Sequence, residues 1–258
     1  MKFFKKVWGL FKERLGNIFI HPQYLTLKFR KKEIEFLTKY IKGITLDIGS
    51  GSQWYKDAVI KKTNSYISLD YPPTSKLYEE TYGKKPHIYG DARKLCIKSS
   101  AIDTVLFLDV IEHIDDPEAA LREINRILKD EGIFCFSVPF LYPLHDIPYD
   151  YRRWTVFGIQ DMMKKNNFQI IEYVKRGNFG TIWGIFFNLN LMYIIQKIIG
   201  YKFFFKWILL LFLFPLIFIF SILMNILALI LEKTVSSDRF TLGYTVVAKK
   251  NVCKNYGD

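Results

Sequence analysis

The sequence predicts an α/β fold in which a doubly wound, seven-stranded sheet carries a hydrophobic helical insert before its last strand. Three observations support this prediction. A short apolar run followed by two glycines, at residues 45–52, is typical of a strand that turns tightly into a helix. Strand-like and helix-like segments then alternate along the chain. Finally, residues 207–231 carry no charged side chain and precede the last strand-like run, at 240–248.

The glycine turn follows the first predicted strand. Gly49 and Gly51 come directly after the apolar run Ile44–Ile48, and a helix-like run follows them. This order is the Rossmann-like arrangement through which α/β proteins receive a nucleotide. Glycine suits the turn because a Cβ would hold the ligand away from the backbone and disfavour positive φ angles. Asp70 ends the second strand, where an acidic side chain can accept hydrogen bonds from both hydroxyls of a ribose.

The residues around the turn indicate which nucleotide it would bind. Trp54 stands where a dinucleotide-binding GxGxxG motif has its third glycine. Asp47 would repel a pyrophosphate but suits a positively charged ligand such as S-adenosylmethionine, which has an ammonium, a sulfonium and no phosphate. The acid, one residue and Gly-x-Gly resemble the first motif of the class I methyltransferases, although Gln53 replaces a further glycine common there. The resemblance implies S-adenosylmethionine as cofactor, held by Asp47, Gly49, Ser50, Gly51 and Asp70.

The resemblance extends without a gap over residues 40–140. After Asp70 we expect a polar loop that contains Pro72 and Pro73. Asp91 and Ala92 follow the third strand-like segment, and in the resembled family such a pair contacts the adenine. The resemblance therefore implies that Asp91 accepts from the exocyclic amine and that the Ala92 backbone contacts a ring nitrogen.

The fourth strand, at residues 101–108, leads into a further cofactor position and a helix. The resemblance places Asp109, at the end of this strand, in the cofactor site. Asp116 and Pro117 form a helix start, and we expect Gly132 to end that helix. This passage is closely similar to methyltransferases that act on the oxygen or carbon atoms of small molecules.

Three residues in this passage also allow a metal site. Asp109, Glu112 and His113 match positions that bind a metal in the O-methyltransferases of the ubiquinone pathway, and a carboxylate pair with a histidine can hold a divalent ion. The alternative is that the histidine shapes the cofactor pocket without a metal, as is common in the resembled group. We favour the alternative and expect no metal.

The loop after the fifth strand, residues 139–155, carries the candidate chemistry. It would stand over the donor methyl group, because ligands lie beyond the carboxyl ends of the strands in a doubly wound sheet. His145 is the candidate base, since imidazole titrates near neutral pH, and Asp146 or Asp150 could orient or replace it. Arg152 and Arg153 would suit an anionic group on the substrate.

A structural role for the same charged residues is an alternative, in which Asp150 pairs with Arg152 or Arg153 and pins the loop. The loop pattern, PFxYPxHxxPxDYxRxT, is similar to that of methyltransferases found among enzymes of cell-surface polysaccharides and lipid-linked glycans. This resemblance implies a glycan acceptor.

The insert lies between the sixth and seventh strands, and its two apolar segments cover residues 183–199 and 207–231. An uncharged apolar stretch of this length is ordinarily a membrane span. Because the flanking strands belong to one sheet, the chain must enter and leave the membrane on the same side. We expect a re-entrant or interface-lying hairpin, with Pro215 as the break, or alternatively a pair of spans. A soluble helical lid would offer too little surface to cover these residues.

The amino terminus and the composition indicate the partners and the compartment of the chain. Residues 1–30 are expected to form a basic amphipathic helix and a linker, which suit either a membrane interface or the edge of the domain. A net charge of +12 favours an anionic partner, and the apolar insert makes lipid a better expectation than nucleic acid. Three cysteines without metal-ligand spacing indicate a reducing compartment, and Cys135 is expected in the core.

The predicted organisation is a Rossmann-like methyltransferase domain at residues 31–178 and 238–250, with a membrane-associated insert at 179–237. We expect an S-adenosylmethionine-dependent methyltransferase that methylates a hydroxyl of a lipid-linked or cell-surface glycan at the cytoplasmic face of the membrane. Two alternatives stay open: a quinone or lipid-headgroup methyltransferase, and a non-catalytic membrane scaffold that retains the fold.

Overall fold

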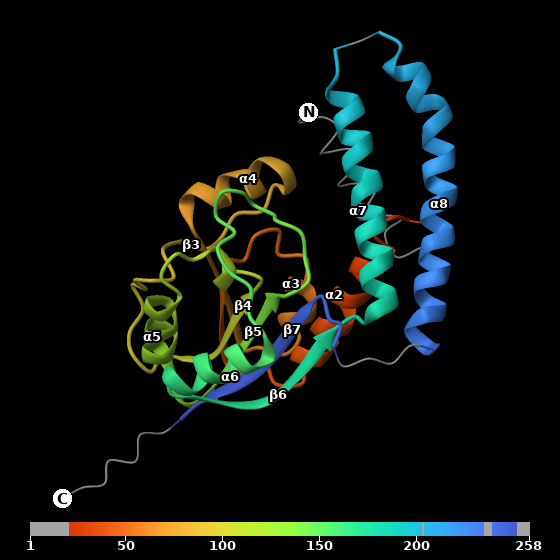
Figure 1. Cartoon of the computed structure of the whole chain (residues 1–258). Helices are drawn as coiled ribbons and strands as arrows, with labels where there is room; N and C mark the ends of the chain where they lie inside the picture. The colour runs from red at the N-terminus through yellow and green to blue at the C-terminus, as the bar shows by residue number, and fades with distance from the viewer. Residues whose placement is uncertain (1–20, 203, 235–238, 252–258) are drawn as a thin grey trace, which may run out of the picture. The chain divides into compact units, whose positions relative to one another are not determined.

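The computed structural model describes residues 21–202, 204–234 and 239–251 (Figure 1). The predicted amphipathic helix within residues 1–19 lies outside this range. The chain divides into two compact units. We call residues 33–175 and 243–258 the sheet unit, and residues 1–32 and 176–242 the hairpin unit, and each is considered by itself.

Seven described strands form one sheet in the order β3-β2-β1-β4-β5-β7-β6. The strands β1 to β5 pair in parallel, and β7 pairs antiparallel with β5. This confirms the predicted doubly wound, Rossmann-like sheet with a helical insert before its last strand. The strand bounds are β1 Ile44–Ile48, β2 Ser65–Asp70, β3 Ile88–Tyr89, β4 Ile102–Leu108, β5 Leu128–Pro139, β6 Phe168–Arg176 and β7 Gly243–Lys250.

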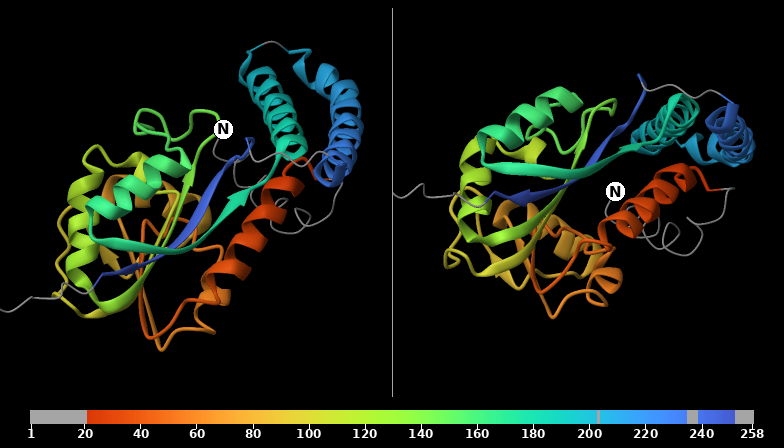
Figure 2. Two further views of the ribbon diagram at one scale, coloured as in Figure 1. Left: turned by 60° about the horizontal axis from the view of Figure 1, so that its bottom comes forward. Right: turned by 90° about the horizontal axis from the view of Figure 1, so that it is seen from below.

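Helices cover both faces of the sheet (Figure 2). Residues of α5 and α6 join one buried cluster, while residues of α3 and the end of α2 join a second. The described helices are α2 Tyr24–Leu37, α3 Lys56–Val59, α4 Pro72–Tyr82, α5 Pro117–Ile127, α6 Val156–Lys165, α7 Phe179–Gly200 and α8 Lys206–Thr234, and η1 is a short 3₁₀ helix at Ile111–His113.

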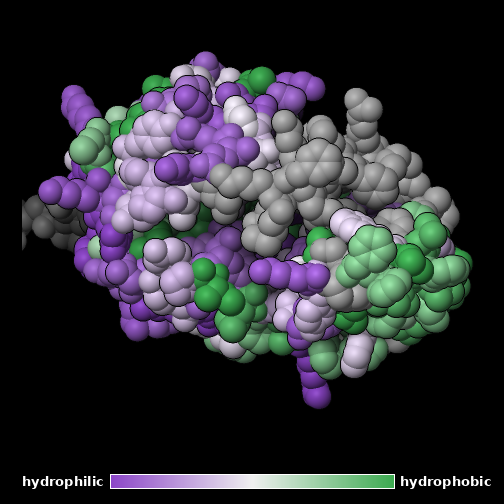
Figure 3. All heavy atoms as spheres, turned by 90° about the horizontal axis from the view of Figure 1, so that it is seen from above, coloured by the Kyte–Doolittle hydropathy of each residue, from purple (hydrophilic) through white to green (hydrophobic). Residues whose placement is uncertain are grey.

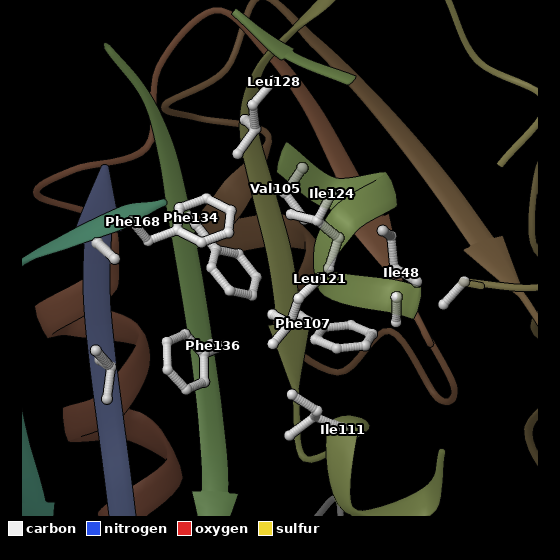
Figure 4. Close-up of a cluster of buried hydrophobic side chains, with 14 of the residues drawn as sticks. Ile48, Val105, Phe107, Ile111, Leu121, Ile124, Leu128, Phe134, Phe136 and Phe168 are labelled. Carbon is white, nitrogen blue, oxygen red and sulfur yellow. The ribbon is translucent and has the colours of Figure 1, made fainter. Parts of the chain in front are cut away.

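The main core lies between α5 and the sheet (Figure 4). Phe134 stacks on Phe136 with ring centroids 4.8 Å apart, and it contacts Phe168 at 5.1 Å. Leu121 and Ile124 of α5 are fully buried and belong to the same cluster as these rings. Alternate residues of β5 point to opposite faces, so Cys135 lies in the second cluster. The expected core position of Cys135 is confirmed.

Two element boundaries differ from the prediction. Pro72 and Pro73 do not lie in a loop but open α4, because the first turn of a helix needs no backbone N–H from these positions. The helix that begins at Pro117 ends at Ile127, and Gly132 lies inside β5 instead of ending the helix. The strand starts early because Leu128 pairs with Ile102 of β4 across a local irregularity.

The hairpin unit consists mainly of α7 and α8, which pack side by side (Figures 1 and 2). Gly180 and Gly184 allow close approach, since a Cβ on Gly180 would lie 2.5 Å from Leu231 Cβ and one on Gly184 would lie 2.8 Å from Ala228 Cβ. The α8 helix runs through Pro215 without interruption, so the expected break at Pro215 is wrong. A neighbouring helix can compensate for the one backbone hydrogen bond that the proline removes.

Apolar side chains dominate the outside of the hairpin (Figure 3). Leu211, Phe212 and Phe220 expose 70%, 67% and 54% of their surface. Polar groups turn inward instead, where Asn188 of α7 donates to the side-chain oxygen of Asn225 of α8 at 2.9 Å, and both residues are buried. The described part of the hairpin thus exposes apolar side chains and buries this polar pair.

Candidate active site

The glycine turn between β1 and α3 has the predicted left-handed backbone. Gly49 and Gly51 have φ values of 72° and 48°. The N–H groups of Gly49 and Ser50 donate to the Leu69 carbonyl oxygen at 2.8 and 3.2 Å, which fixes the turn against β2. A Cβ on Gly49 would lie 2.4 Å from Val110 Cγ2, so glycine is needed there for space as well as for φ.

Gln53 keeps the backbone shape of the glycine that it replaces. Its φ is 51°, which is unusual for a residue with a side chain. The side chain is buried and donates to the Lys85 carbonyl oxygen at 3.0 Å, which stabilises this conformation. The turn therefore keeps its tight backbone with Gln53 in place of the glycine common in the resembled motif.

Asp70 lies where the prediction places it, at the end of β2 beside the turn. Its Oδ2 accepts from the N–H of Gly51 at 2.9 Å, and its Oδ1 accepts from the N–H of Tyr71 at 2.8 Å. Burial raises the pKa of this carboxyl, while the hydrogen bonds from the two N–H groups lower it. The carboxylate thus links the two strand ends at which a ribose would lie.

Asp47 has a different environment from the one expected. It has no exposed surface, and its two carboxylate oxygens accept from the hydroxyls of Tyr55 and Tyr66. Burial raises the pKa of Asp47 to about 7, although the two tyrosine hydroxyls lower it. Direct contact between Asp47 and the ammonium of a ligand is not supported by this geometry; the residue instead ties β1 to β2 and to the start of α3.

Asp91 and Ala92 follow β3, as expected, but Asp91 already has a partner. Arg93 binds it through Nε and Nη2, at 3.0 and 2.6 Å, and also pairs with Asp115 at 2.5 Å. The Arg93 guanidinium holds the pKa of Asp91 below its ordinary value. An adenine amine would share this carboxylate with Arg93.

Asp109 ends β4 in a strained conformation, with φ at 52°. Its N–H donates to the Ser137 carbonyl oxygen at 3.1 Å, and its Oδ1 lies 3.3 Å from Ser137 Oγ on β5. Strained residues of this kind cluster at functional sites, and this one directs the chain from β4 into η1.

The loop after β5 is held by a chain of charged side chains. Arg153 binds both oxygens of Asp150, whose side chain is only 2% exposed. Asp150 Oδ2 lies 3.2 Å from His145 Nδ1 and also accepts from the His145 N–H at 3.0 Å. The Arg153 guanidinium holds the pKa of Asp150 well below its ordinary value. The structural pairing that the sequence left open is therefore present for Arg153.

Arg152 has no part in that pairing. It donates to the carbonyl oxygens of Ile114 and Asp115, both at 2.8 Å, and so ties the loop to the segment after η1. Asp146 is the most exposed of the predicted catalytic acids, with 56% of its side chain accessible, and it lies 3.8 Å from His113 Nε2. Both guanidinium groups thus already bind the protein itself, and the expected anion-binding role of the two arginines stays a prediction.

Glu112 and His113 of η1 meet His145 of the loop. Glu112 Oε1 lies 3.7 Å from His145 Nε2 and 3.8 Å from His113 Nε2, and the Glu112 side chain is fully buried. Burial raises the pKa of Glu112. Burial alone would lower the pKa of His145, but the nearby carboxylates of Glu112 and Asp150 outweigh it, so the pKa of His145 is raised.

The sequence predicts only a possible metal role for Glu112, beside Asp109 and His113. The structure replaces Asp109 by His145 in the convergent group. Because Glu112 and His145 lie far apart in the chain, no local sequence pattern indicates their contact. The acid and the two histidines do follow neighbouring strands of the sheet, however, and this placement alone suggests that they meet.

Comparisons with known proteins agree with this architecture. Residues 46–136 match the family model described as a methyltransferase domain. An uncharacterized protein of Methanocaldococcus jannaschii is 29% identical over 162 residues, which are 62% of this chain and 58% of that protein. A protein of Mycolicibacterium smegmatis described as an S-adenosylmethionine-dependent methyltransferase is 26% identical over 36% of this chain and 37% of its own length.

Two further proteins extend the comparison. A demethylmenaquinone methyltransferase of Streptomyces griseus is 28% identical over 41% of this chain and 48% of its own. The chain thus spans less than two thirds of the length of these curated relatives. A solved structure described as a sarcosine dimethylglycine methyltransferase from Galdieria sulphuraria has the same fold, with a TM-score of 0.55, 14% identity and coverage of 87% of this chain and 86% of that one. Residues 46–136 thus match a methyltransferase domain, this match implies S-adenosylmethionine as the cofactor, and the chain has the methyltransferase fold.

Proposed function

We propose that the protein transfers a methyl group from S-adenosylmethionine to a hydroxyl of a membrane-borne acceptor, a lipid-linked or cell-surface glycan, at the cytoplasmic face of the membrane. One observation carries the proposal. The glycine turn after β1 and the Glu112–His145 contact, beyond β4 and β5, stand at the carboxyl ends of neighbouring parallel strands. This is the edge at which doubly wound sheets bind their ligands.

The residues around the turn fit the cofactor. Gly49 and Gly51 give the turn its positive φ angles, and Asp70 stands beside them for the ribose hydroxyls. Ala92 comes after β3 and Asp109 comes directly after β4, so both lie at the carboxyl ends of the strands. When bound, the cofactor supplies an electrophilic methyl group, so the protein has mainly to align the acceptor and accept its proton.

The loop after β5 supplies the surface for the acceptor. Asp150 and Arg153 fix the ring of His145, and this orients a candidate base for a hydroxyl proton. Tyr149 and Tyr151 are each 48% exposed and can stack on sugar faces. These aromatic groups favour a glycan over a small charged acceptor.

The hairpin unit supports a membrane location. The helices α7 and α8 have 22 and 29 residues and qualify by length and composition as candidate membrane spans. At ~1.5 Å per residue, each exceeds the roughly 30 Å hydrocarbon core of a bilayer. The exposed side chains of α8 are almost all apolar, whereas the buried Asn188 and Asn225 bond to each other. A helical hairpin that enters lipid gives the enzyme access to an acceptor that cannot leave the membrane.

A quinone or another lipid headgroup is a second candidate acceptor. It is supported by the similarity to a demethylmenaquinone methyltransferase and by the group formed by Glu112, His113 and His145. Mass spectrometry of membrane lipids from cells with and without the protein separates the two. A mass increase of one CH₂ on a glycolipid supports the first acceptor, and the same increase on a quinone supports the second.

Titration calorimetry with S-adenosylmethionine tests the cofactor assignment. Gly49→Ala is expected to weaken binding at least tenfold, because the new Cβ meets Val110 in the turn. Gly83→Ala is the matched control, since Gly83 also has a positive φ but a Cβ added there would meet no atom within 4 Å. Equal affinity for both variants would contradict the placement of the cofactor. If the wild-type protein binds no S-adenosylmethionine, the non-catalytic membrane scaffold is the hypothesis that remains.

A further inference from the structure

The two histidines that face Glu112 both present a nitrogen lone pair to it. His113 Nδ1 lies 3.0 Å from the Tyr149 carbonyl oxygen, which can only accept a hydrogen bond, so Nδ1 carries the proton. His145 Nδ1 lies 3.3 Å from the Pro143 carbonyl oxygen and 3.2 Å from Asp150, which also only accept. In the neutral imidazoles, both Nε2 atoms are therefore unprotonated and point toward Glu112.

Within the described part of the chain, Glu112 has no hydrogen bond that compensates for its burial, although the Arg153 guanidinium interacts with it through its charge. Its side chain has no exposed surface, and neither carboxylate oxygen receives a hydrogen bond from a described residue. A buried carboxylate without a partner costs several kcal/mol in free energy. Three electron-pair donors thus converge within 4.8 Å of one another around a buried acid that receives no hydrogen bond from a described residue.

The spacing of the three atoms suits a metal ion better than a shared proton. Glu112 Oε1 lies 3.7 and 3.8 Å from the two Nε2 atoms, and all three lie within 4.8 Å of one another. A proton cannot bridge such a distance, because hydrogen bonds to nitrogen are roughly 3 Å long. Tetrahedral coordination at ~2.0 Å per bond places neighbouring ligand atoms about 3.3 Å apart, so small side-chain shifts complete the site.

The surroundings of the two imidazoles are those of metal-bound histidines. Metal-ligating histidines donate their other N–H to a carboxylate or a carbonyl, which fixes the tautomer and the ring orientation. His145 does so to Asp150, which Arg153 holds in place, and His113 does so to the Tyr149 backbone. The supporting contacts are thus already formed.

We propose that Glu112, His113 and His145 bind one divalent ion of the imidazole-preferring class, with Zn²⁺ as the representative. Two nitrogen donors and one oxygen donor suit Zn²⁺ or Fe²⁺ better than Mg²⁺, which prefers oxygen. This set differs from the Asp109, Glu112 and His113 set considered from the sequence, and it gives His145 a ligand role in place of a base role. When bound, the ion would lower the pKa of an acceptor hydroxyl; only this consequence rests on the proposed function.

Metal binding by the full-length protein in detergent tests the proposal. The protein carries a tag without histidine and the changes Cys96→Ser and Cys253→Ser, so that tag and thiols contribute no binding. After treatment with a chelator, Zn²⁺ or Mg²⁺ is titrated, and bound metal is measured by elemental mass spectrometry and by calorimetry. We expect one Zn²⁺ per chain and a Zn²⁺ affinity at least ~100-fold above that for Mg²⁺.

Substitutions locate the bound ion. Glu112→Gln keeps the shape of the side chain, and His145→Ala removes one ligand from the other loop; each is expected to weaken Zn²⁺ binding at least ~100-fold. His87→Ala is the matched control, since His87 contacts Ser68 far from the group in sequence and is not a ligand. Circular dichroism confirms folding, and Zn²⁺ should raise the thermal midpoint of the His87→Ala protein but not of the Glu112→Gln protein.

Two results would overturn the inference. One is a chain that binds no Zn²⁺, and the other is equal Zn²⁺ binding by the parent and by Glu112→Gln. Binding of S-adenosylmethionine by the Zn²⁺-free protein is measured in parallel. If the cofactor binds and Zn²⁺ does not, the metal inference fails while the proposed methyltransferase function stands.

Discussion

The sheet unit and the hairpin unit treat their large apolar side chains in opposite ways. In the sheet unit Phe107, Phe134 and Phe136 have no exposed surface. In the hairpin unit Leu211 and Phe212 expose about two thirds or more of theirs, at 70% and 67%. Burial of apolar surface stabilises the first unit in water, whereas the second leaves most of its apolar surface without a protein partner. The difference supports the proposal that the hairpin unit contacts lipid while the sheet unit lies in water.

Charges placed on the hairpin should produce the largest effect. The double variant Ile219→Lys and Leu223→Lys puts two charges on exposed positions near the middle of α8. Each is expected to cost roughly 3 kcal/mol in lipid, so the protein should move from the membrane pellet to the soluble fraction or to aggregates. Phe157→Lys, at a 76% exposed position of α6, is the control and should stay with the membrane. Unchanged sedimentation of the double variant would contradict lipid contact by α8.

A cavity in the sheet unit should have the next largest effect. Phe134→Ala removes a fully buried ring that contacts Phe136 and Phe168, and we expect a loss of about 3–5 kcal/mol in unfolding free energy. Chemical denaturation followed by circular dichroism measures this loss. Ile171→Ala, at a 43% exposed position of β6, should cost much less. Similar losses for both would mean that the core shown in Figure 4 does not hold the unit together.

The pH dependence of stability should reveal the buried Asp47. Its pKa is about 7 in the folded protein, against an ordinary value of 3.8 for an aspartate in water. Because the folded state holds this proton more tightly, Asp47 contributes stability that is fully present below about pH 4 and is lost as the pH rises to about 7. Asp47→Asn should remove this component, so thermal midpoints of the variant should fall less between these pH values than those of the wild type. Parallel curves would show that Asp47 ionises normally.

The asparagine pair in the hairpin should have the smallest effect. Asn188→Leu leaves the Asn225 oxygen without the hydrogen bond that it now receives. Interhelical hydrogen bonds in membranes are worth roughly 0.6–2 kcal/mol, so the loss should be of this size. A double-mutant cycle with Asn225→Leu, measured by unfolding in detergent, isolates the pair. A coupling energy of zero would show that the two side chains do not depend on each other.

Local patterns predicted much of the sheet unit. The strand, glycine turn and helix around Gly49 and the acid at Asp70 depend on residues close in sequence, and the structure shows that backbone arrangement. Boundaries that depend on distant strands were less predictable. Gly132 looks like a helix end, but pairing of Leu128 with Ile102 extends β5 past it toward α5. Prolines were also misleading, because Pro72 begins a helix and Pro215 lies within one.

The candidate site depended on contacts that no local pattern reveals. The sequence identified His145, Asp150 and Arg153 as candidate catalytic residues. It could not distinguish Arg152 from Arg153 as the partner of Asp150. The structure also showed that Asp47 is enclosed by Tyr55 and Tyr66, which come from the N-cap of α3 and from β2. Arg152 is held by the distant backbone of Ile114 and Asp115, and Asp47 by side chains from other elements, so packing between separate segments decides both.

Transfer of a labelled methyl group tests the central claim most directly. Membranes from cells that lack the protein are incubated with the purified protein and S-adenosylmethionine that carries a radioactive methyl group, and lipids are then extracted. The account predicts label in the lipid extract with wild-type protein and little with Gly49→Ala, while Gly83→Ala resembles the wild type. Label found only in water-soluble products, or none with a wild-type protein that binds the cofactor, would contradict methylation of a membrane-borne acceptor.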